Sequence, residues 1–435
     1  MQYPNMPDYR AVLQHLYEYA KLRCEYGANV QDVENILLKA EESLKEAISQ
    51  INSLPIDEKL ALQEPNCLED IRKLRPDGPR RLWGKFDREK YLEKVEGALL
   101  ARMAGCTLGA IVEGWPIESM REWAEFIGDP FPPVDYWSQA KDPSNLRYDK
   151  NRNQDYTRDK MDGVPVDDDV TYTLLGLLIV EDFGKDFTTE DVAKAWIKYL
   201  PIACTAEDIA LRNIKAGISA YEAADKGNPY CQWIGADIRS DGWAYLAPGY
   251  PEKAAEMAYR DAYLSHRRNG IYGEMFFSAA QAAAFAVDNA VDALKVGLTE
   301  IPENCLLADA VRWALEEAKN IKDYRDARQA VDDRFKGMSG VHTINNACLT
   351  IFGLTIGGND VTKVLSQTVA MGLDNDCTAA TAGSIVGALV GKTGIPEHWY
   401  RPFNNKIHTY MNNAEIFKID DVINRYAKQA EIILG

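Results

Sequence analysis

The sequence predicts an all-α protein, and three observations support this fold class. Apolar residues recur every three or four positions through most of the chain, which is the spacing of amphipathic helices. Strand candidates are few and short. The composition, 46% hydrophobic and 26% charged over 435 residues, is that of a globular protein and excludes disordered and fibrous classes. We therefore expect a helical bundle whose remaining loops are long enough to build a cleft.

Net charge and the lack of targeting signals argue against nucleic-acid-binding, secreted and membrane-spanning classes of protein. The chain carries 49 Lys and Arg against 66 Asp and Glu, a formal charge of −17, so its long-range field repels polyanions and general nucleic-acid binding is not expected. Residues 1–4 contain no basic segment leading into an apolar run, so we expect no secretory signal. The most apolar stretch, 378–390, is shorter than the ~20 residues of a membrane helix. We expect a cytoplasmic protein without a membrane partner.

The cysteines give no sign of a cross-linked or zinc-bound framework. The chain has 8 of them, and no two form a short CxxC pair. This spacing argues against a zinc site and against a disulfide framework. We expect buried thiols.

The first fifty residues predict a helical hairpin. Apolar residues from Val33 to Ile51 define an amphipathic helix, and a shorter pattern from Tyr9 to Leu22 would form its antiparallel partner. Residues 27–29 would make the turn. We expect the hairpin to pack on the main body, although the spacing also allows a homodimer contact through these helices.

A basic run follows the hairpin and sets the predicted domain boundary. Pro and Gly interrupt residues 72–81, so no regular element is expected there. A solvated linker is the favoured interpretation, although the basic residues could also touch a polyanion. The predicted division is an N-terminal extension and linker, 1–82, followed by a catalytic domain, 83–435.

Helical patterns dominate the second part of the chain. They predict helices at 91–104, 170–180, 189–199, 206–224, 251–263, 276–294, 305–319, 345–356, 360–371, 378–390 and 419–433. The longest irregular piece, 115–165, contains several aromatic residues and prolines. A loop of this length and composition is expected to be ordered and to cover a site.

Two acidic clusters each precede a strongly apolar helix. They are Asp167-Asp168-Asp169 and Asp374-Asn375-Asp376. An Asp at a helix N-cap stabilises the helix by about 0.5–2 kcal/mol, so capping alone is sufficient to explain either cluster taken by itself. A cap uses one acid, however, and neighbouring acids repel one another. The surplus therefore suggests a neutralising cation.

The helix after the second cluster strengthens this interpretation. Ala379, Gly383 and Gly387 lie on one face, so the helix can approach its neighbours closely and belongs in the protein centre. Burying Asp374 and Asp376 there without partners would cost several kcal/mol each, and no Lys or Arg lies nearby in sequence. Carboxylate ligands select Mg²⁺, Mn²⁺ or Ca²⁺ over Zn²⁺. We expect two metal ions bridged by carboxylates.

Two further segments carry candidate site residues. Glu113 closes the small-residue segment 105–114 and is either a surface residue at a helix end or a functional acid. In segment 265–273, tight turns would expose backbone N–H groups, and His266 and Arg267 would supply donors for a phosphate or sugar. An ordinary surface turn is the alternative.

Together these segments resemble the ADP-ribosylglycohydrolase superfamily. The resemblance runs from about Gly97 to Trp399 and leaves the N-terminal hairpin outside. Its parts are the Ala-Gly-x-x-Leu-Gly-x-x-x-Glu segment ending in Glu113, the pair Asp168-Asp169, the segment 235–239, Ser265-His266, and Asp374-x-Asp376 with its small-residue helix and 394–399. Several motifs in the same order make a specific signal.

The resemblance implies an orthogonal helical bundle around a binuclear Mg²⁺ or Mn²⁺ centre, with Ca²⁺ less expected. It places the metal ligands on Asp167, Asp168, Asp169, Asp374, Asp376 and Cys377. It places the glutamate that approaches the scissile bond on Glu113, and it implies hydrolysis of an N- or O-glycosidic bond at ribose C1.

These residues suit that chemistry. Cleavage of a ribosyl bond passes through an oxocarbenium-like transition state, which carboxylates near C1 stabilise. We assign proton transfer or water activation to Glu113, with Asp169 and a metal-bound hydroxide as alternatives. Predicted substrate-binding residues are Trp115, Gly235, Asp237, Arg239, His266, Arg267, Asn269, Gly270, Tyr272 and Gly273.

The sequence also departs from the family pattern. Asp167 stands where the family has a hydroxyl residue, and Cys377 stands where it has a Thr that often ligates a metal. A thiol is a poor Mg²⁺ ligand, so either position 377 does not ligate or the site favours Mn²⁺.

Three functions are weighed. The leading one is a metal-dependent hydrolase of ADP-ribosyl conjugates, possible modified proteins included. The second is a hydrolase of a smaller furanoside, such as a nucleoside or an O-acyl-ADP-ribose, which the aromatic segment 115–165 favours because it would close the pocket over the metals. The third is a catalytically inactive, crystallin-like or binding protein. The complete set of candidate carboxylates argues against that last function.

Overall fold

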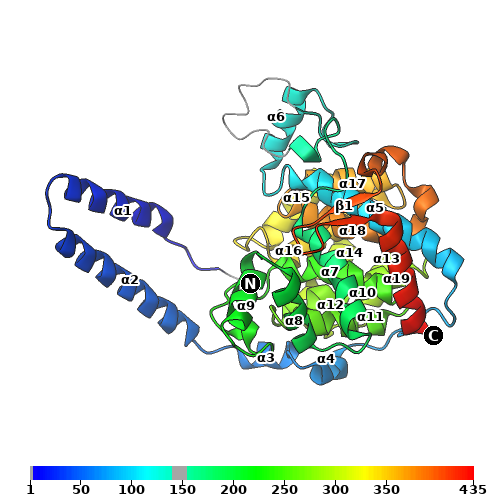
Figure 1. Cartoon of the computed structure of the whole chain (residues 1–435), viewed down its shortest axis with the longest axis horizontal. Helices are drawn as coiled ribbons and strands as arrows, with labels where there is room; N and C mark the ends of the chain where they lie inside the picture. Colours follow the sequence, from blue (N-terminus) through cyan, green and yellow to red (C-terminus); the bar gives the residue numbers. More distant parts are fainter. Residues whose placement is uncertain (1–2, 140–153) are drawn as a thin grey trace. The chain divides into compact units, whose positions relative to one another are not determined.

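The computed structural model describes residues 3–139 and 154–435. The chain divides into two compact units, residues 1–62 and 63–435. Figure 1 shows the helices of both units. The stretch 140–153 of the predicted aromatic loop lies outside the described residues.

The smaller unit contains the predicted hairpin. Helix α1 (Tyr9–Glu25) and helix α2 (Val30–Asn52) run antiparallel (Figure 1). Asp8 accepts a hydrogen bond from the backbone N–H of Ala11, and Asn29 caps α2 in the same way. Helix α3 (Glu58–Gln63) follows. The predicted turn at 27–29 therefore separates two capped helices, as expected.

The larger unit is a helical bundle, and the whole structure is 64% helical. Its α-helices, among the described residues, are α4 Leu68–Leu74, α5 Arg88–Ala110, α6 Ile117–Ile127, α7 Asp168–Phe183, α8 Thr189–Tyr199, α9 Thr205–Lys215, α10 Ser240–Leu246, α11 Pro251–Ala262, α12 Asn269–Ala284, α13 Ala290–Leu298, α14 Leu306–Glu317, α15 Tyr324–Arg334, α16 Thr343–Gly357, α17 Val361–Ala370, α18 Asn375–Val390 and α19 Ile419–Leu434.

Short elements complete the larger unit. The 3₁₀ turns are η2 Gln154–Tyr156, η3 Ala223–Asp225, η4 Ile234–Arg239, η5 Lys392–Gly394, η6 Glu397–Trp399 and η7 Arg401–Phe403. Strands β1 (Lys406–His408) and β2 (Ile416–Lys418) form an antiparallel pair in which Ile407 faces Phe417. The all-α fold class is confirmed. No helix in residues 3–139 and 154–435 is long and apolar enough to span a membrane.

Helices α5 and α18 form the central contact of the bundle, and their glycines allow it. A Cβ on Gly105 of α5 would lie 2.1 Å from the carbonyl oxygen of Ala379, and one on Gly383 of α18 would lie 2.3 Å from that of Ala101. Only glycine therefore permits this approach of two backbones. The small-residue face predicted for 378–390 packs in the protein centre against the other small-residue segment.

Several boundaries differ from the predicted ones. The expected helix 206–224 ends at Lys215, because Gly217 adopts a positive φ of 86°. The expected helix 276–294 is two helices, α12 and α13, because Asn289 caps a new helix by accepting from the N–H of Asp292. Helix α15 was not predicted, since its surface is largely polar. The irregular segment 115–165 contains α6, whose buried side chains are Met120, Trp123 and Ala124.

The basic run 72–81 is not a solvated linker. Helix α4 extends to Leu74, and Arg75 then pairs with both Glu252 and Glu300 at 2.5 Å. Arg80 also pairs with Glu300, at 2.8 Å, and the side chain of Glu300 is fully buried. The segment is therefore part of the larger compact unit, and the two compact units divide at 62/63. Sequence spacing could not reveal this buried carboxylate.

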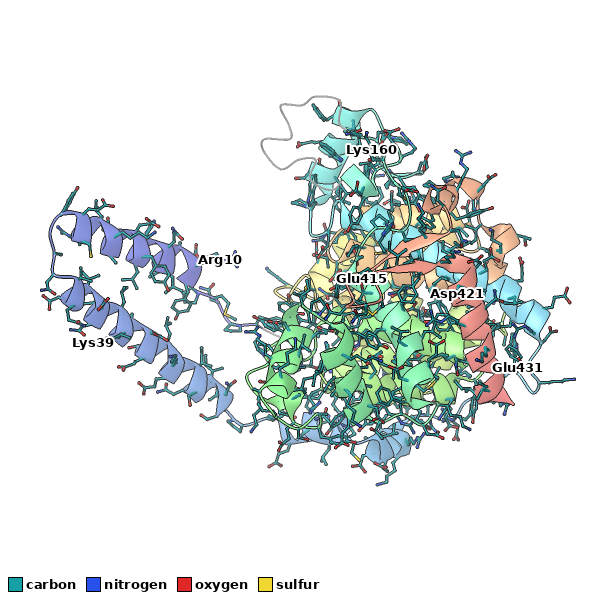
Figure 2. All side chains as sticks on the ribbon, in the orientation of Figure 1. Arg10, Lys39, Lys160, Glu415, Asp421 and Glu431 are labelled. Atoms are coloured by element: carbon teal, nitrogen blue, oxygen red, sulfur yellow. The ribbon has the colours of Figure 1, made fainter. Side chains whose placement is uncertain are left out.

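Much of the acidic excess is a solvated surface. Glu415, Asp421 and Glu431 are exposed on the larger unit (Figure 2). Other acids lie in the interior, some paired with arginines, as Glu300 is, and some gathered at the helix starts described below.

Candidate metal centre

Three segments that are distant in sequence bring their acidic side chains together. Ligand atoms of Glu113, Asp374 and Asp376 lie within 4.8 Å of one another, and the same holds for Asp169, Asp376 and Cys377. The first cluster, Asp167-Asp168-Asp169, forms a third such group. The ends of α5, α7 and α18 therefore meet at one place, and every predicted metal ligand lies there.

The first cluster begins α7. Asp167 is the N-cap, and its carboxylate accepts from the backbone N–H of Asp169 at 3.0 Å. Its carbonyl oxygen accepts from the hydroxyl of Thr171 at 2.6 Å. Capping thus explains the conformation of Asp167, while Asp168 stays half-buried and faces the other carboxylates.

Asp169 has an internal counter-ion that the sequence did not indicate. Arg102 of α5 is buried, and its Nη2 lies 3.2 Å from Oδ1 of Asp169. The same guanidinium pairs with Asp241 at 2.8 Å and donates to the carbonyl oxygen of Ile238 at 2.6 Å. Burial nevertheless raises the pKa of Asp169 to about 7, against the lowering effect of Arg102. Arg102 therefore offsets part of the cost of burying Asp169.

A strained loop places the second cluster. Gly372 and Leu373 both have positive φ, 70° and 60°, immediately before Asp374. The N–H of Gly114 donates to the carbonyl oxygen of Leu373 at 2.9 Å. The N–H of Asp374 donates to Oδ1 of Asn346 at 3.3 Å. These bonds hold the segment after Glu113 beside the start of α18, which is why the two acids meet.

The second cluster has no internal counter-ion. Asp374 and Asp376 are 5% and 4% exposed, and the Oδ1 atom of each has no hydrogen-bond partner. Within the described part of the chain, no Lys, Arg or His pairs with either carboxylate. Burial raises the pKa of Asp376 to about 7 and that of Asp374 well above its usual range. Such orphaned oxygens are expected where a cation supplies the missing charge.

Glu113 lies at the open side of this cluster. Its side chain is exposed, and the charge of Asp376, followed by partial desolvation and the charge of Asp168, raises its pKa to about 7. A carboxyl group with this pKa is populated in both protonation states near neutral pH. It can therefore give or take a proton there.

Gly109 of α5 allows the segment that leads to Glu113 and the start of α18 to meet. A Cβ at this position would lie 2.4 Å from the Cα of Asp376. The carbonyl oxygen of the preceding Leu108 accepts from Nε1 of Trp137 at 2.9 Å. The aromatic segment predicted to cover the site thus anchors one of its tryptophans on the helix that leads to Glu113.

The donor set fits divalent cations. It consists of carboxylate oxygens and one sulfur, the thiol of Cys377, which donates to Oδ2 of Asp169 at 3.0 Å. Oxygen donors are those of Mg²⁺ and Mn²⁺, and the sulfur shifts the preference toward the softer ion.

Two tyrosines beside the cluster were missed by the sequence analysis. Burial, with the charges of Asp167 and Asp168, raises the pKa of Tyr156 and of Tyr410. Tyr156 donates to the carbonyl oxygen of Val166. Its position within 115–165 was a usable signal, whereas nothing near Tyr410 in sequence marked it as a site residue.

The predicted arginine donors are committed to internal contacts. Arg239 is 2% exposed and pairs with Asp261 at 2.5 Å and Glu207 at 2.7 Å. Arg267 pairs with Asp225 at 2.9 Å. Both arginines therefore have structural contacts that leave no free donor face for a phosphate.

The other predicted substrate-binding residues of segment 265–273 are also buried. His266 contacts Ser265, Asn269 donates to Glu64, and Tyr272 donates to the carbonyl oxygen of Pro65. Added Cβ atoms at Gly235, Gly270 and Gly273 would meet Glu207, Cys231 and Thr343. These contacts indicate packing roles. His342 is the N-cap of α16, where its side chain accepts from the N–H of Ile344.

Two predicted substrate residues do lie at the cluster. The Asp237 carboxyl is buried with Oδ1 unpartnered, and burial, with the charge of Asp169, raises its pKa. Trp115 lies two residues after Glu113 and packs edge-on against Trp123, with their ring centroids 6.3 Å apart. The structure therefore keeps Asp237 and Trp115 as candidates for contacting a substrate.

Comparison with known proteins identifies the family. The ADP-ribosylglycohydrolase family model matches residues 87–431, more than half of the chain. The chain belongs to the ADP-ribosylglycohydrolase family. Membership supports a glycohydrolase, and ADP-ribosylglycohydrolases are generally metal-dependent. The matched range contains every residue of the candidate metal centre and excludes the hairpin.

Other comparisons add less. No curated protein matches this chain. A solved structure titled "ADP-ribosylglycohydrolase-related protein complex" is similar at 17% identity and a TM-score of 0.48, covering 80% of this chain and 100% of that one.

Proposed function

We propose that this ADP-ribosylglycohydrolase-family protein is a divalent-cation-dependent hydrolase that cleaves the N- or O-glycosidic bond at ribose C1 of an ADP-ribosyl conjugate. One observation carries the proposal. Glu113, exposed and with a pKa raised to about 7, stands beside two buried carboxylates that have no internal counter-ion. This observation supports a role for Glu113 in proton transfer beside a cation site.

The chain's own residues would have separate roles in the reaction. Glu113 transfers a proton at the scissile bond or to the attacking water, because it is populated in both states near neutral pH. The carboxylates of the cluster stabilise the positive charge that develops on the ribose ring. Trp115 and the buried carboxyl of Asp237 would orient the sugar.

Bound divalent cations, held by the first cluster, Asp374, Asp376 and Cys377, would supply Lewis-acid orientation of the ribose hydroxyls and lower the pKa of a water. We infer that Mn²⁺ is preferred over Mg²⁺, because the thiol of Cys377 lies among the ligand atoms. Cys377→Thr should reduce this preference about tenfold, or about 1.4 kcal/mol, in competition calorimetry. An unchanged ratio of the two affinities would exclude Cys377 as a ligand.

A substrate panel tests the reaction. The metal-loaded protein is incubated with ADP-ribosyl-arginine, ADP-ribosyl-serine, O-acetyl-ADP-ribose and nucleosides, with and without EDTA. Release of the ribosyl product that EDTA abolishes is expected. Product formation that EDTA does not suppress contradicts the role of the cations, and silence on every compound favours a catalytically inactive protein.

Two variants test Glu113. Glu113→Gln should keep cation affinity and lower turnover by about 10²–10⁴-fold, since it removes the proton-transfer group. Glu118→Gln is the matched control, because Glu118 is exposed on α6 and pairs only with Arg121 among the described residues. Near-normal turnover of Glu113→Gln would overturn the assignment.

A smaller furanoside is the second candidate substrate. Tyr156, Tyr410 and Trp115 lie around the cluster, and aromatic side chains around a confined site suit a compact ligand better than a modified protein. In the same panel, activity confined to nucleosides or O-acetyl-ADP-ribose would support this candidate over the first.

A further inference from the structure

Within the hairpin, α1 and α2 leave most of each other's apolar residues uncovered. No residue of α1 or α2 is buried. Large side chains that are more than half exposed are Tyr9, Val12, Tyr17, Tyr19, Val30, Ile36, Leu38, Ile48 and Ile51. Helices draw most of their stability from tertiary packing of an apolar face, so a hairpin of this kind requires a cover.

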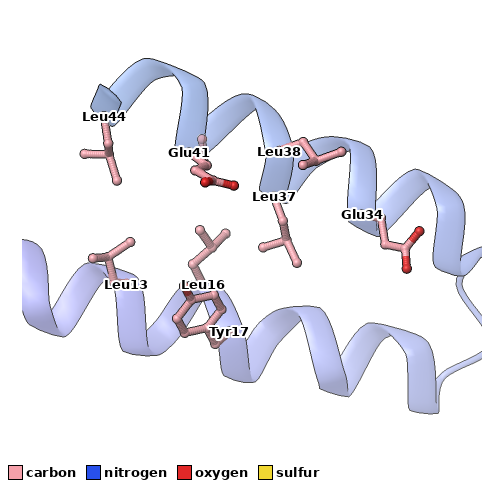
Figure 3. A pocket seen from close by; sticks show the side chains of 9 residues that line it. Leu13, Leu16, Tyr17, Glu34, Leu37, Leu38, Glu41 and Leu44 are labelled. Atoms are coloured by element: carbon pink, nitrogen blue, oxygen red, sulfur yellow. The ribbon is translucent and has the colours of Figure 1, made fainter. Parts of the chain in front are cut away.

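An apolar groove lies between the two helices of the hairpin. A groove of about 430 Å³ runs between α1 and α2, and Leu13 and Leu16 face Leu37 and Leu44 across it (Figure 3). Glu34 and Glu41 also line it. The groove is therefore an apolar seam bordered by charge, which is the arrangement of a packing interface.

The sequence of α2 has the repeat of an associating helix. Apolar residues at 30, 33, 37, 40, 44, 47 and 51 alternate spacings of three and four, which is a heptad pattern over the whole helix. Helix α2 has 23 residues and α1 has 17, so the seam of α2 extends beyond its partner. Alanines at 40 and 47 would let another helix approach closely.

We propose that two copies of the chain pair through their hairpins and form an intermolecular four-helix bundle. The apolar heptad of α2 continues beyond the length of α1, and a second hairpin of the same sequence offers this uncovered length a partner helix. A two-fold axis places the same seam on both copies, so the surface needs no other partner. This inference is independent of the proposed catalytic function.

The oligomeric state of the full-length protein tests the inference. Light scattering after size exclusion should give a dimer for the wild type at micromolar concentration. Leu37→Glu with Leu44→Glu should raise the dimer dissociation constant at least ~100-fold, because it buries two charges in the seam. Lys39→Glu with Lys45→Glu is the matched control on the exposed part of α2 and should remain dimeric.

The double variant could lose the dimer because its hairpin unfolds. Cross-linking of the unmutated protein tests the pairing without that complication. In a mixture of ¹⁴N- and ¹⁵N-labelled copies, lysine cross-links between hairpins of different copies are expected, at Lys21, Lys39 and Lys45. A monomeric wild type, a dimer that survives Leu37→Glu with Leu44→Glu, or cross-links only from the hairpin to residues 63–435 of the same copy would each overturn the proposal.

Discussion

The two acidic clusters of the candidate centre begin helices in the same way but are neutralised differently. In the first cluster, Asp169 pairs with the buried guanidinium of Arg102. In the second cluster, Asp374 and Asp376 are equally buried, keep unpartnered oxygens, and have no cationic partner in the described chain. Helix capping by Asp167 and the ion pair of Asp169 offset part of the burial cost in the first cluster. The second cluster has no such internal compensation, which is why we propose a cation there.

Removal of Arg102 should have the largest effect on stability. Arg102→Met leaves Asp169 and Asp241 buried without their counter-ion, and we expect a loss of about 3–5 kcal/mol in the free energy of unfolding. Urea denaturation measures it. Arg121→Met, which removes an exposed pair with Glu118, should change stability by less than about 1 kcal/mol. Equal losses for the two variants would show that Arg102 does not neutralise the first cluster.

A smaller effect is expected from crowding the second cluster. Gly109→Ala places a Cβ 2.4 Å from the Cα of Asp376, so the start of α18 must shift. We expect a loss of about 1–3 kcal/mol in stability, and weaker Mn²⁺ binding in calorimetry. Gly176→Ala is the control, because its Cβ would meet Trp243 only at 3.5 Å. An Mn²⁺ affinity of Gly109→Ala equal to that of the wild type would show that the start of α18 does not contribute to the metal centre.

The pH dependence of the metal-free protein should also distinguish the clusters. The folded-state pKa of Asp376 is raised to about 7, above its ordinary value of 3.8, so the folded protein binds more protons than the unfolded chain between these values. Stability without metal should therefore fall as pH rises from about 4 to 7. Asp376→Asn should flatten this fall in thermal melts recorded with EDTA. A metal-free protein that becomes more stable over that range would contradict the assignment.

The sequence predicted the fold better than the boundaries of its helices. Three- and four-residue spacing is a local property, so helices such as α8 were located at both ends. The break between α12 and α13 depends on one capping residue, Asn289, within a run that is apolar on both sides. Helix α15 buries only Tyr324, Ala327 and Val331, which is too few for a clear pattern.

The site was predictable where motifs begin helices and unpredictable where tertiary contacts decide. The acidic pairs and Glu113 converge as expected, because the glycines at 105 and 109 let α5 and α18 meet. In the sequence, Arg239 looked like a hydrogen-bond donor to a phosphate, because its acidic partners, Glu207 and Asp261, are distant in sequence. Arg102 was overlooked for the same reason.

Thermal stability with and without Mn²⁺ tests the central claim most directly, namely that the second cluster holds a cation. The wild type should gain about 2.7 kcal/mol at a free Mn²⁺ concentration one hundred times the dissociation constant, and EDTA should abolish the gain. Asp374→Asn with Asp376→Asn should show no gain, because it removes the uncompensated carboxylates. A wild type that Mn²⁺ and Mg²⁺ leave unchanged, or a double variant that gains as much as the wild type, would contradict the account.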